Sequence, residues 1–122
     1  MASHPLNLAL RFLLEIAALV AFGYWGWTQG AGVLRWLLGI GLPLIAAAAW
    51  GTFNVPDDPS RSGRAPVRVP GLVRLALEVV FFGLAVWAVF AVGQPRWAWM
   101  LIGLLLVHYA KSYDRLIWLL RH

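Results

Sequence analysis

Four apolar runs of about twenty residues each account for most of this chain and leave few folds open to it. They lie at 6–27, 33–53, 71–92 and 97–119, separated by segments rich in glycine, proline and charge. A helix of about twenty residues crosses the roughly 30 Å hydrocarbon core of a bilayer. Helices are expected for all four runs, because backbone polar groups cannot stay unpaired in lipid. The runs predict an all-α, four-helix transmembrane bundle of two helical hairpins, forming one domain over residues 1–122.

Composition agrees with a membrane protein and excludes most soluble classes. The chain is 61% hydrophobic and 12% charged, whereas a soluble domain carries about 25% charged residues. Its net charge of +5 suits an anionic lipid surface, so no nucleic-acid partner is expected. The absence of cysteine excludes disulfides, thiolate metal sites and thiol nucleophiles.

The distribution of basic residues predicts the orientation. An even number of spans places both termini and the loop at 54–70 on one side of the membrane. Cytoplasmic segments are enriched in lysine and arginine, so both termini are expected in the cytoplasm. No cleavable signal peptide is expected, since the first apolar run is of spanning length. The far side would carry only Arg35 and Arg96, whereas the near side would carry Arg11, Arg61, Arg64, Arg68, Arg74, Lys111, Arg115 and Arg121.

Charged residues lie inside the apolar runs, where they are costly and therefore informative. The first and third runs each hold an arginine followed four positions later by a glutamate, and a shift of 63 positions superposes the two pairs. Counting 1.5 Å per residue from the cytoplasmic side places a histidine and a lysine of the fourth run near the same depth. The candidate intramembrane polar site is Arg11, Glu15, Arg74, Glu78, His108 and Lys111.

Two interpretations of this site remain open. Ion pairs near a membrane boundary can fasten helices together, or a carboxylate can serve a proton or a small charged ligand. Arginine before glutamate is the weaker order for a pair within one helix. Pairs between helices, Arg11 with Glu78 and Arg74 with Glu15, are therefore expected.

Eight tryptophans form a second group, most of them near the expected outer interface. Aromatic belts at both interfaces explain this distribution without a ligand. The alternative is an aromatic pocket for a cation or an apolar molecule, which requires several rings to converge. Its candidate residues are Trp25, Trp36, Trp87 and Trp99.

The loop at 54–70 and the remaining motifs add few functional signals. Arg61, Arg64 and Arg68 are expected to contact anionic head groups. Two adjacent aspartates, Asp57 and Asp58, are too few oxygens for a metal site. The sequence contains no phosphate-binding loop, zinc-protease motif or serine elbow. No enzymatic activity, metal or cofactor is expected.

Several short motifs resemble a family of small bacterial membrane proteins, the YrdB-like family. The resemblance covers about residues 7–95 and is carried by Asn-Leu-Ala-Leu-Arg-Phe-Leu-Leu-Glu at 7–15 and Phe-Gly-Tyr-Trp-Gly at 22–26. It extends to Leu-Pro-Leu at 42–44, Ala-Trp-Gly-Thr-Phe at 49–53 and Leu-Ala-Leu-Glu at 75–78. The resemblance implies four spans in a bacterial inner membrane and no activity.

Three functions follow from these patterns. The favoured one is a structural or accessory role, in which the charged layer holds helices together or docks a partner, either a second copy or another membrane protein. The alternatives are a small-solute or proton-coupled transporter that uses Glu15, Glu78, His108 and Lys111, and a tryptophan-lined module that binds lipid or a hydrophobic ligand.

Overall fold

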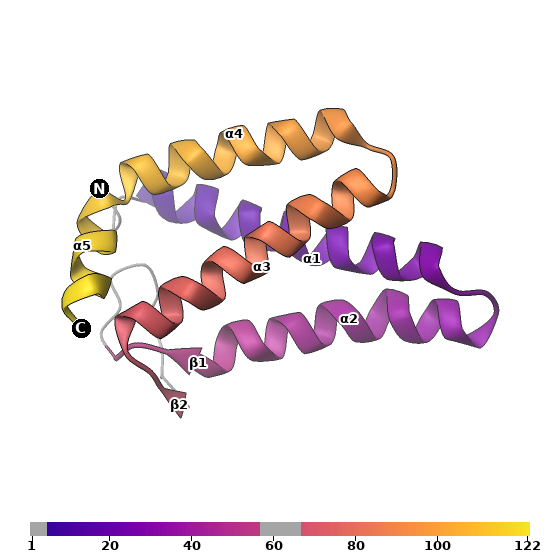
Figure 1. Cartoon of the computed structure of the whole chain (residues 1–122), viewed down its shortest axis with the longest axis horizontal. Coiled ribbons are helices and arrows are strands. Elements are labelled where there is room, and N and C mark those ends of the chain that lie inside the picture. Colours follow the sequence, from indigo (N-terminus) through magenta and orange to yellow (C-terminus); the bar gives the residue numbers. More distant parts are fainter. Residues whose placement is uncertain (1–4, 57–66) are drawn as a thin grey trace.

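A computed structural model describes residues 5–56 and 67–122 of the chain. This part is predominantly helical, as the sequence predicts. Two long helical hairpins lie side by side, and a short helix turns across one end (Figure 1). The helices are α1 (Pro5–Gln29), α2 (Val33–Thr52), α3 (Gly71–Ala91), α4 (Pro95–Lys111) and α5 (Tyr113–Arg121).

Two short strands border the segment between the hairpins, where only a loop was predicted. β1 (Phe53–Asn54) and β2 (Val67–Arg68) pair in parallel. The residues between Pro56 and β2 lie outside the described part of the chain, and so do Arg61 and Arg64 with their expected head-group contacts.

Within residues 5–56 and 67–122, three helices, α1, α2 and α3, are long and apolar enough to cross a membrane. The fourth predicted run differs, because the continuous helix expected over 97–119 is divided at Ser112 into α4 and α5. Ser112 leaves helical geometry with φ −106° and ψ 21°, and its buried hydroxyl accepts a hydrogen bond from Asn7 at 2.7 Å. The nine residues of α5 include three charges, Asp114, Arg115 and Arg121, which disfavour a straight continuation into lipid.

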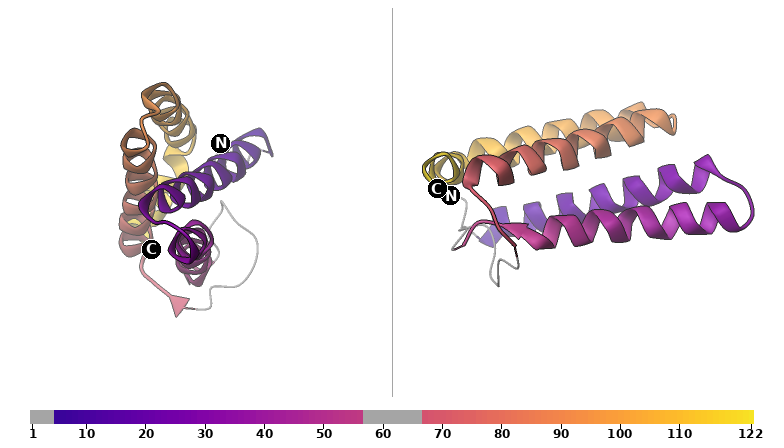
Figure 2. Two further views of the ribbon diagram at one scale, coloured as in Figure 1. Left: turned by 90° about the vertical axis from the view of Figure 1, so that its right-hand side faces the viewer. Right: turned by 60° about the horizontal axis from the view of Figure 1, so that its bottom comes forward.

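The apolar core lies where α1 meets α3, and its central buried side chains are Leu14, Ala18, Phe81, Phe82 and Ala85. By contrast, α2 has no fully buried residue, and the hairpin that it forms with α1 can be followed in Figure 2. Small residues allow these two helices to pack closely. A Cβ atom placed on Gly26 would lie 2.5 Å from the carbonyl oxygen of Leu38.

A glycine also allows α5 to pack closely against the start of α3. Gly71 is the first residue of α3, and a Cβ atom there would overlap the backbone carbonyl of Leu119 in α5. Leu119 is fully buried at this crossing. The contact holds α5 across the end of the bundle, about one turn before Arg74 and two turns before Glu78.

Candidate functional site

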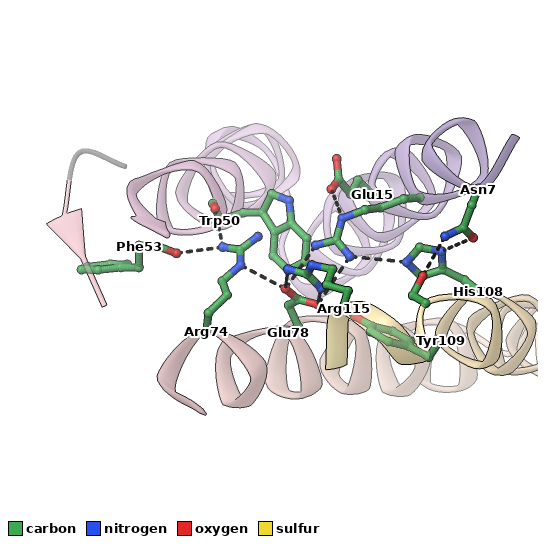
Figure 3. A network of polar contacts seen from close by, with 11 residues as sticks. Asn7, Glu15, Trp50, Phe53, Arg74, Glu78, His108, Tyr109 and Arg115 are labelled. Atoms are coloured by element: carbon green, nitrogen blue, oxygen red, sulfur yellow. Dashed lines mark hydrogen bonds and ion pairs between the residues drawn. The ribbon is translucent and has the colours of Figure 1, made fainter. Parts of the chain in front are cut away.

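Glu78 of α3 lies at the centre of a buried polar cluster at the end of the bundle where α5 crosses (Figure 3). Its side chain has no solvent exposure. Arg115 of α5 donates to both carboxylate oxygens, at 2.9 Å and 2.6 Å, and the hydroxyl of Tyr109 donates to one of them at 2.6 Å. Arg74 donates at 3.1 Å, and Arg11 of α1 reaches the two oxygens at 3.4 Å and 3.2 Å. Four helices thus converge on one carboxylate.

Arg74 also joins the cluster to the end of α2. Its Nη1 donates to the carbonyl oxygens of Trp50 and Phe53 at 2.7 Å and 2.9 Å, and its guanidinium lies 4.1 Å from the centre of the Trp50 ring. The last carbonyls of a helix lack intrahelical partners and carry a partial negative charge. The end of α2 therefore accommodates part of the positive charge that three arginines bring to the site.

Arg11 connects the buried carboxylate to a partly exposed one. Its Nε lies 3.3 Å from Glu15, whose side chain is 26% exposed, while its Nη2 pairs with Glu78. The predicted pair between Arg11 and Glu78 therefore forms. Among the described residues, Arg74 pairs with Glu78 within its own helix and not with Glu15. Both pairs within a helix, Arg11 with Glu15 and Arg74 with Glu78, form despite their weaker order.

A second polar chain runs from the cluster along α1 and α4. The Nε2 of His108 lies 3.4 Å from Nη1 of Arg11, and its Nδ1 lies 3.0 Å from Oδ1 of Asn7. Arginine only donates hydrogen bonds and a carbonyl oxygen only accepts them, so Nε2 accepts and Nδ1 donates. His108 is held as one neutral tautomer. The amide of Asn7 then donates to Ser112 at the break before α5.

The structure brings together five of the six predicted polar residues and replaces the sixth. Lys111 is exposed at the end of α4. Arg115 takes the buried position that the prediction gave to Lys111, because the turn at Ser112 carries α5 back over α3. Tyr109 was also missed, since its apolar ring at the expected depth gave no signal for a hydroxyl directed at Glu78.

The four candidate tryptophans do not converge on one point. Trp25 packs against Trp87 with ring centres 5.3 Å apart. Trp36 instead packs on Trp27, and Trp99 on Phe90. The rings form separate pairs along the helices, and the structure does not assemble the four into one pocket.

Apolar grooves open on the described part of the bundle, and one of them adjoins the charged cluster at Trp50. One, of about 390 Å³, lies between α2 and α3 and is lined in part by Trp25, Trp50 and Trp87. The other, of about 740 Å³, runs between α1 and α4 from Leu10 to Trp97. Neither groove is lined by Glu15 or Glu78.

Chemically, the cluster is a saturated ion-pair network. A carboxylate offers about four lone-pair sites, whereas Glu78 faces six donor contacts from three arginines and a tyrosine. Within the described residues, no group of three or more histidine, aspartate or glutamate side chains could hold a metal ion. The arrangement joins side chains of four helices and offers no free coordination position at Glu78.

Fold and site define a small helical protein with membrane-length helices and a charged cluster buried at one end. The chain belongs to the family described as "Protein of unknown function (DUF2568)", whose model matches residues 9–106. It is similar to the uncharacterized protein YrdB of Bacillus subtilis (strain 168), with 39% identity over 114 residues that cover 93% of each chain. The resemblance noted from the sequence motifs is therefore confirmed. No solved structure matches the chain.

Proposed function

We propose that this protein is a non-enzymatic, four-span protein of the bacterial inner membrane, with both termini in the cytoplasm. Its charged layer fastens the two hairpins and α5 into one unit at the cytoplasmic end. The observation that carries the proposal is the fully buried carboxylate of Glu78, which accepts hydrogen bonds from residues of α1, α3, α4 and α5. A fastening role calls for a dry and fully paired carboxylate, and Glu78 has both properties.

The accessory part of the proposal concerns what the fastened unit presents to a partner. α2 packs against α1 yet has no buried residue, and several of its large side chains face outward, including Leu37 (62% exposed) and Leu44 (64% exposed). Such a helix is available to another membrane protein or to a second copy. The rigid cytoplasmic end would keep this face in a fixed orientation.

Glutamine substitutions test the fastening role. Glu78→Gln leaves three buried guanidinium groups with one fewer negative charge, and breaking a buried ion pair costs about 3–5 kcal/mol. We expect a large drop in the thermal unfolding midpoint in detergent. The matched control is Glu15→Gln, which removes a partly exposed pair and should cost no more than about 1 kcal/mol. Equal midpoints for the two variants would contradict the fastening role.

A carrier function has one observation in its favour, the partial exposure of Glu15 at a depth of several turns in α1. The same control variant separates the two functions. If Glu15→Gln keeps the unfolding midpoint of the unmodified protein but abolishes its uptake of protons into vesicles, Glu15 serves a transported ion. If uptake is absent from the unmodified protein as well, only the fastening role remains.

A further inference from the structure

The larger apolar groove follows the side of the bundle between α1 and α4. Both helices run along the long axis of the molecule (Figure 1), so in the proposed topology the groove lies roughly along the membrane normal. At about 1.5 Å per residue, its wall on α1 extends about 21 Å, from Leu10 to Tyr24. Its volume of about 740 Å³ is within the range of pockets that bind small molecules.

The walls of the groove are apolar and open to the surroundings. Leu13 and Val20 of α1 are 62% and 63% exposed, and Met100 of α4 is 53% exposed. An exposed apolar surface of this kind marks a contact with a membrane, a ligand or another protein. Between the walls, the groove is closed on its inner side by buried and partly buried residues of three helices, Leu14, Ala21, Val89 and Leu101.

Lys111 lies at the end of the groove that is nearer to the charged cluster. It follows the groove residue Leu104 by two helical turns, so both side chains lie on the same side of α4. Lys111 is exposed at the last residue of α4. A lysine can keep its methylene stem on an apolar surface while its ammonium group stays at the level of the head groups. In the proposed topology this end is cytoplasmic, where anionic head groups attract basic residues.

The dimensions and the charge of the groove favour a lipid over a second protein helix. A helix about 10 Å in diameter would occupy roughly 1,600 Å³ over the same length, more than twice the volume of the groove. An acyl chain is narrower, and a chain of one leaflet extends through about half of the roughly 30 Å hydrocarbon core. A second copy related by a two-fold axis along the membrane normal would also bring its own Lys111 to the same level, where like charges repel.

We propose that the groove between α1 and α4 binds an acyl chain of an anionic phospholipid of the cytoplasmic leaflet, whose phosphate pairs with Lys111. The inference rests on the proposed membrane topology and adds a lipid site to it. The lipid joins the two hairpins along the length of the bundle, as the charged cluster joins them at one end. Lys111, which lies outside the cluster, then has a role of its own.

Substitutions in the groove and at its charged end test the proposal. Ala17 lines the groove and is exposed, so Ala17→Trp fills the groove without displacing a core side chain. Its matched control is Ala48→Trp, at an exposed alanine of α2 that lines neither of the two grooves. Lys111→Gln removes the charge, and its control is Arg121→Gln, which removes an exposed charge of α5 at the same end of the bundle.

Each protein is purified in detergent and titrated with phosphatidylglycerol or phosphatidylcholine, and bound lipid is measured by native mass spectrometry. We expect the unmodified protein to bind one phosphatidylglycerol more tightly than phosphatidylcholine. Ala17→Trp should bind neither lipid. Lys111→Gln should bind phosphatidylglycerol about fivefold more weakly, the effect of one basic residue near an anionic surface. Both controls should bind like the unmodified protein.

Equal lipid binding by Ala17→Trp and Ala48→Trp would overturn the proposal, because the lipid would then lie elsewhere on the protein. An equal loss in Lys111→Gln and Arg121→Gln would overturn it as well, since the position of the charge would not matter. A dimer that Ala17→Trp dissociates, in place of bound lipid, would assign the groove to a second copy. A protein that stays monomeric in water after removal of the detergent would instead contradict the membrane topology itself.

Discussion

At the scale of single residues, the carboxylate of Glu78 is surrounded by more positive charge than it can neutralise. Arg11, Arg74 and Arg115 pair with it, and, of these three arginines, Glu15 pairs with Arg11 alone. The surplus is met by the carbonyls at the end of α2 and by the Trp50 ring. We therefore expect a single hydrogen bond to Glu78 to make a measurable contribution to the free energy of unfolding.

Tyr109 provides the cleanest test of such a bond. Tyr109→Phe removes only the hydroxyl that donates to Glu78 at 2.6 Å and leaves the aromatic packing in place. Because a hydrogen bond to a charged group contributes about 1.5–3 kcal/mol, we expect the free energy of unfolding to fall toward the lower part of this range. Circular dichroism during thermal unfolding in detergent measures the change.

The control for Tyr109→Phe is Tyr24→Phe, which removes a hydroxyl from a side chain that is 51% exposed. Its unfolding midpoint should match that of the unmodified protein. An equal loss in both variants would mean that the Tyr109 bond has no special role.

Position along the apolar runs was sufficient to predict Arg11, Glu15, Arg74, Glu78 and His108 as neighbours, because all five lie at a similar distance from the same end of the predicted bundle. Depth does not include rotation about a helix axis, so it could not exclude the pair between Arg74 and Glu15. The positions of Arg115 and Tyr109 depend on the break at Ser112 and on packing between distant helices. Neither is encoded in hydropathy.

At the scale of elements, α5 owes its position to the glycine at the start of α3. Gly71→Ala would place a methyl group against the backbone of Leu119, and overpacking of this kind costs about 1–3 kcal/mol. We expect α5 to loosen and the amides of residues 113–121 to exchange hydrogen faster. Hydrogen-exchange mass spectrometry in detergent gives this measurement.

Gly83→Ala is the matched control in the same helix. A Cβ atom on Gly83 meets nothing within 4 Å, so the substitution adds helix propensity without a clash. Exchange in α5 should be unchanged in this variant. If Gly71→Ala also left α5 unchanged, the close crossing of α3 and α5 would not determine the position of α5.

The long helices could be predicted from sequence because each apolar run is bounded by glycine, proline or charge. The bounds of α1, α2 and α3 lie within two residues of the predicted runs. α5 was merged with the fourth run because Leu116, Ile117, Trp118 and Leu119 continue its apolar character. The three charges among nine residues were the available signal for a separate, amphipathic helix.

At the scale of the whole molecule, the fourth helix decides how many spans the proposed membrane topology has. α4 has 17 residues and extends about 25 Å, at the lower limit of spanning length. If α4 spans, its start and α5 lie on opposite sides of the membrane. If it does not, they lie on the same side, and the bundle has three spans.

Labelling in intact cells distinguishes these cases. Gln29→Cys and Gln94→Cys place single thiols at the ends of α1 and before α4, where both native side chains are exposed, and Arg121→Cys places one at the end of α5. With four spans and cytoplasmic termini, a membrane-impermeant maleimide should label positions 29 and 94 in intact spheroplasts and position 121 only after lysis. Labelling of 94 and 121 together before lysis would mean that α4 does not cross, and the two hairpins would then differ in topology despite their shared Arg-x-x-x-Glu spacing.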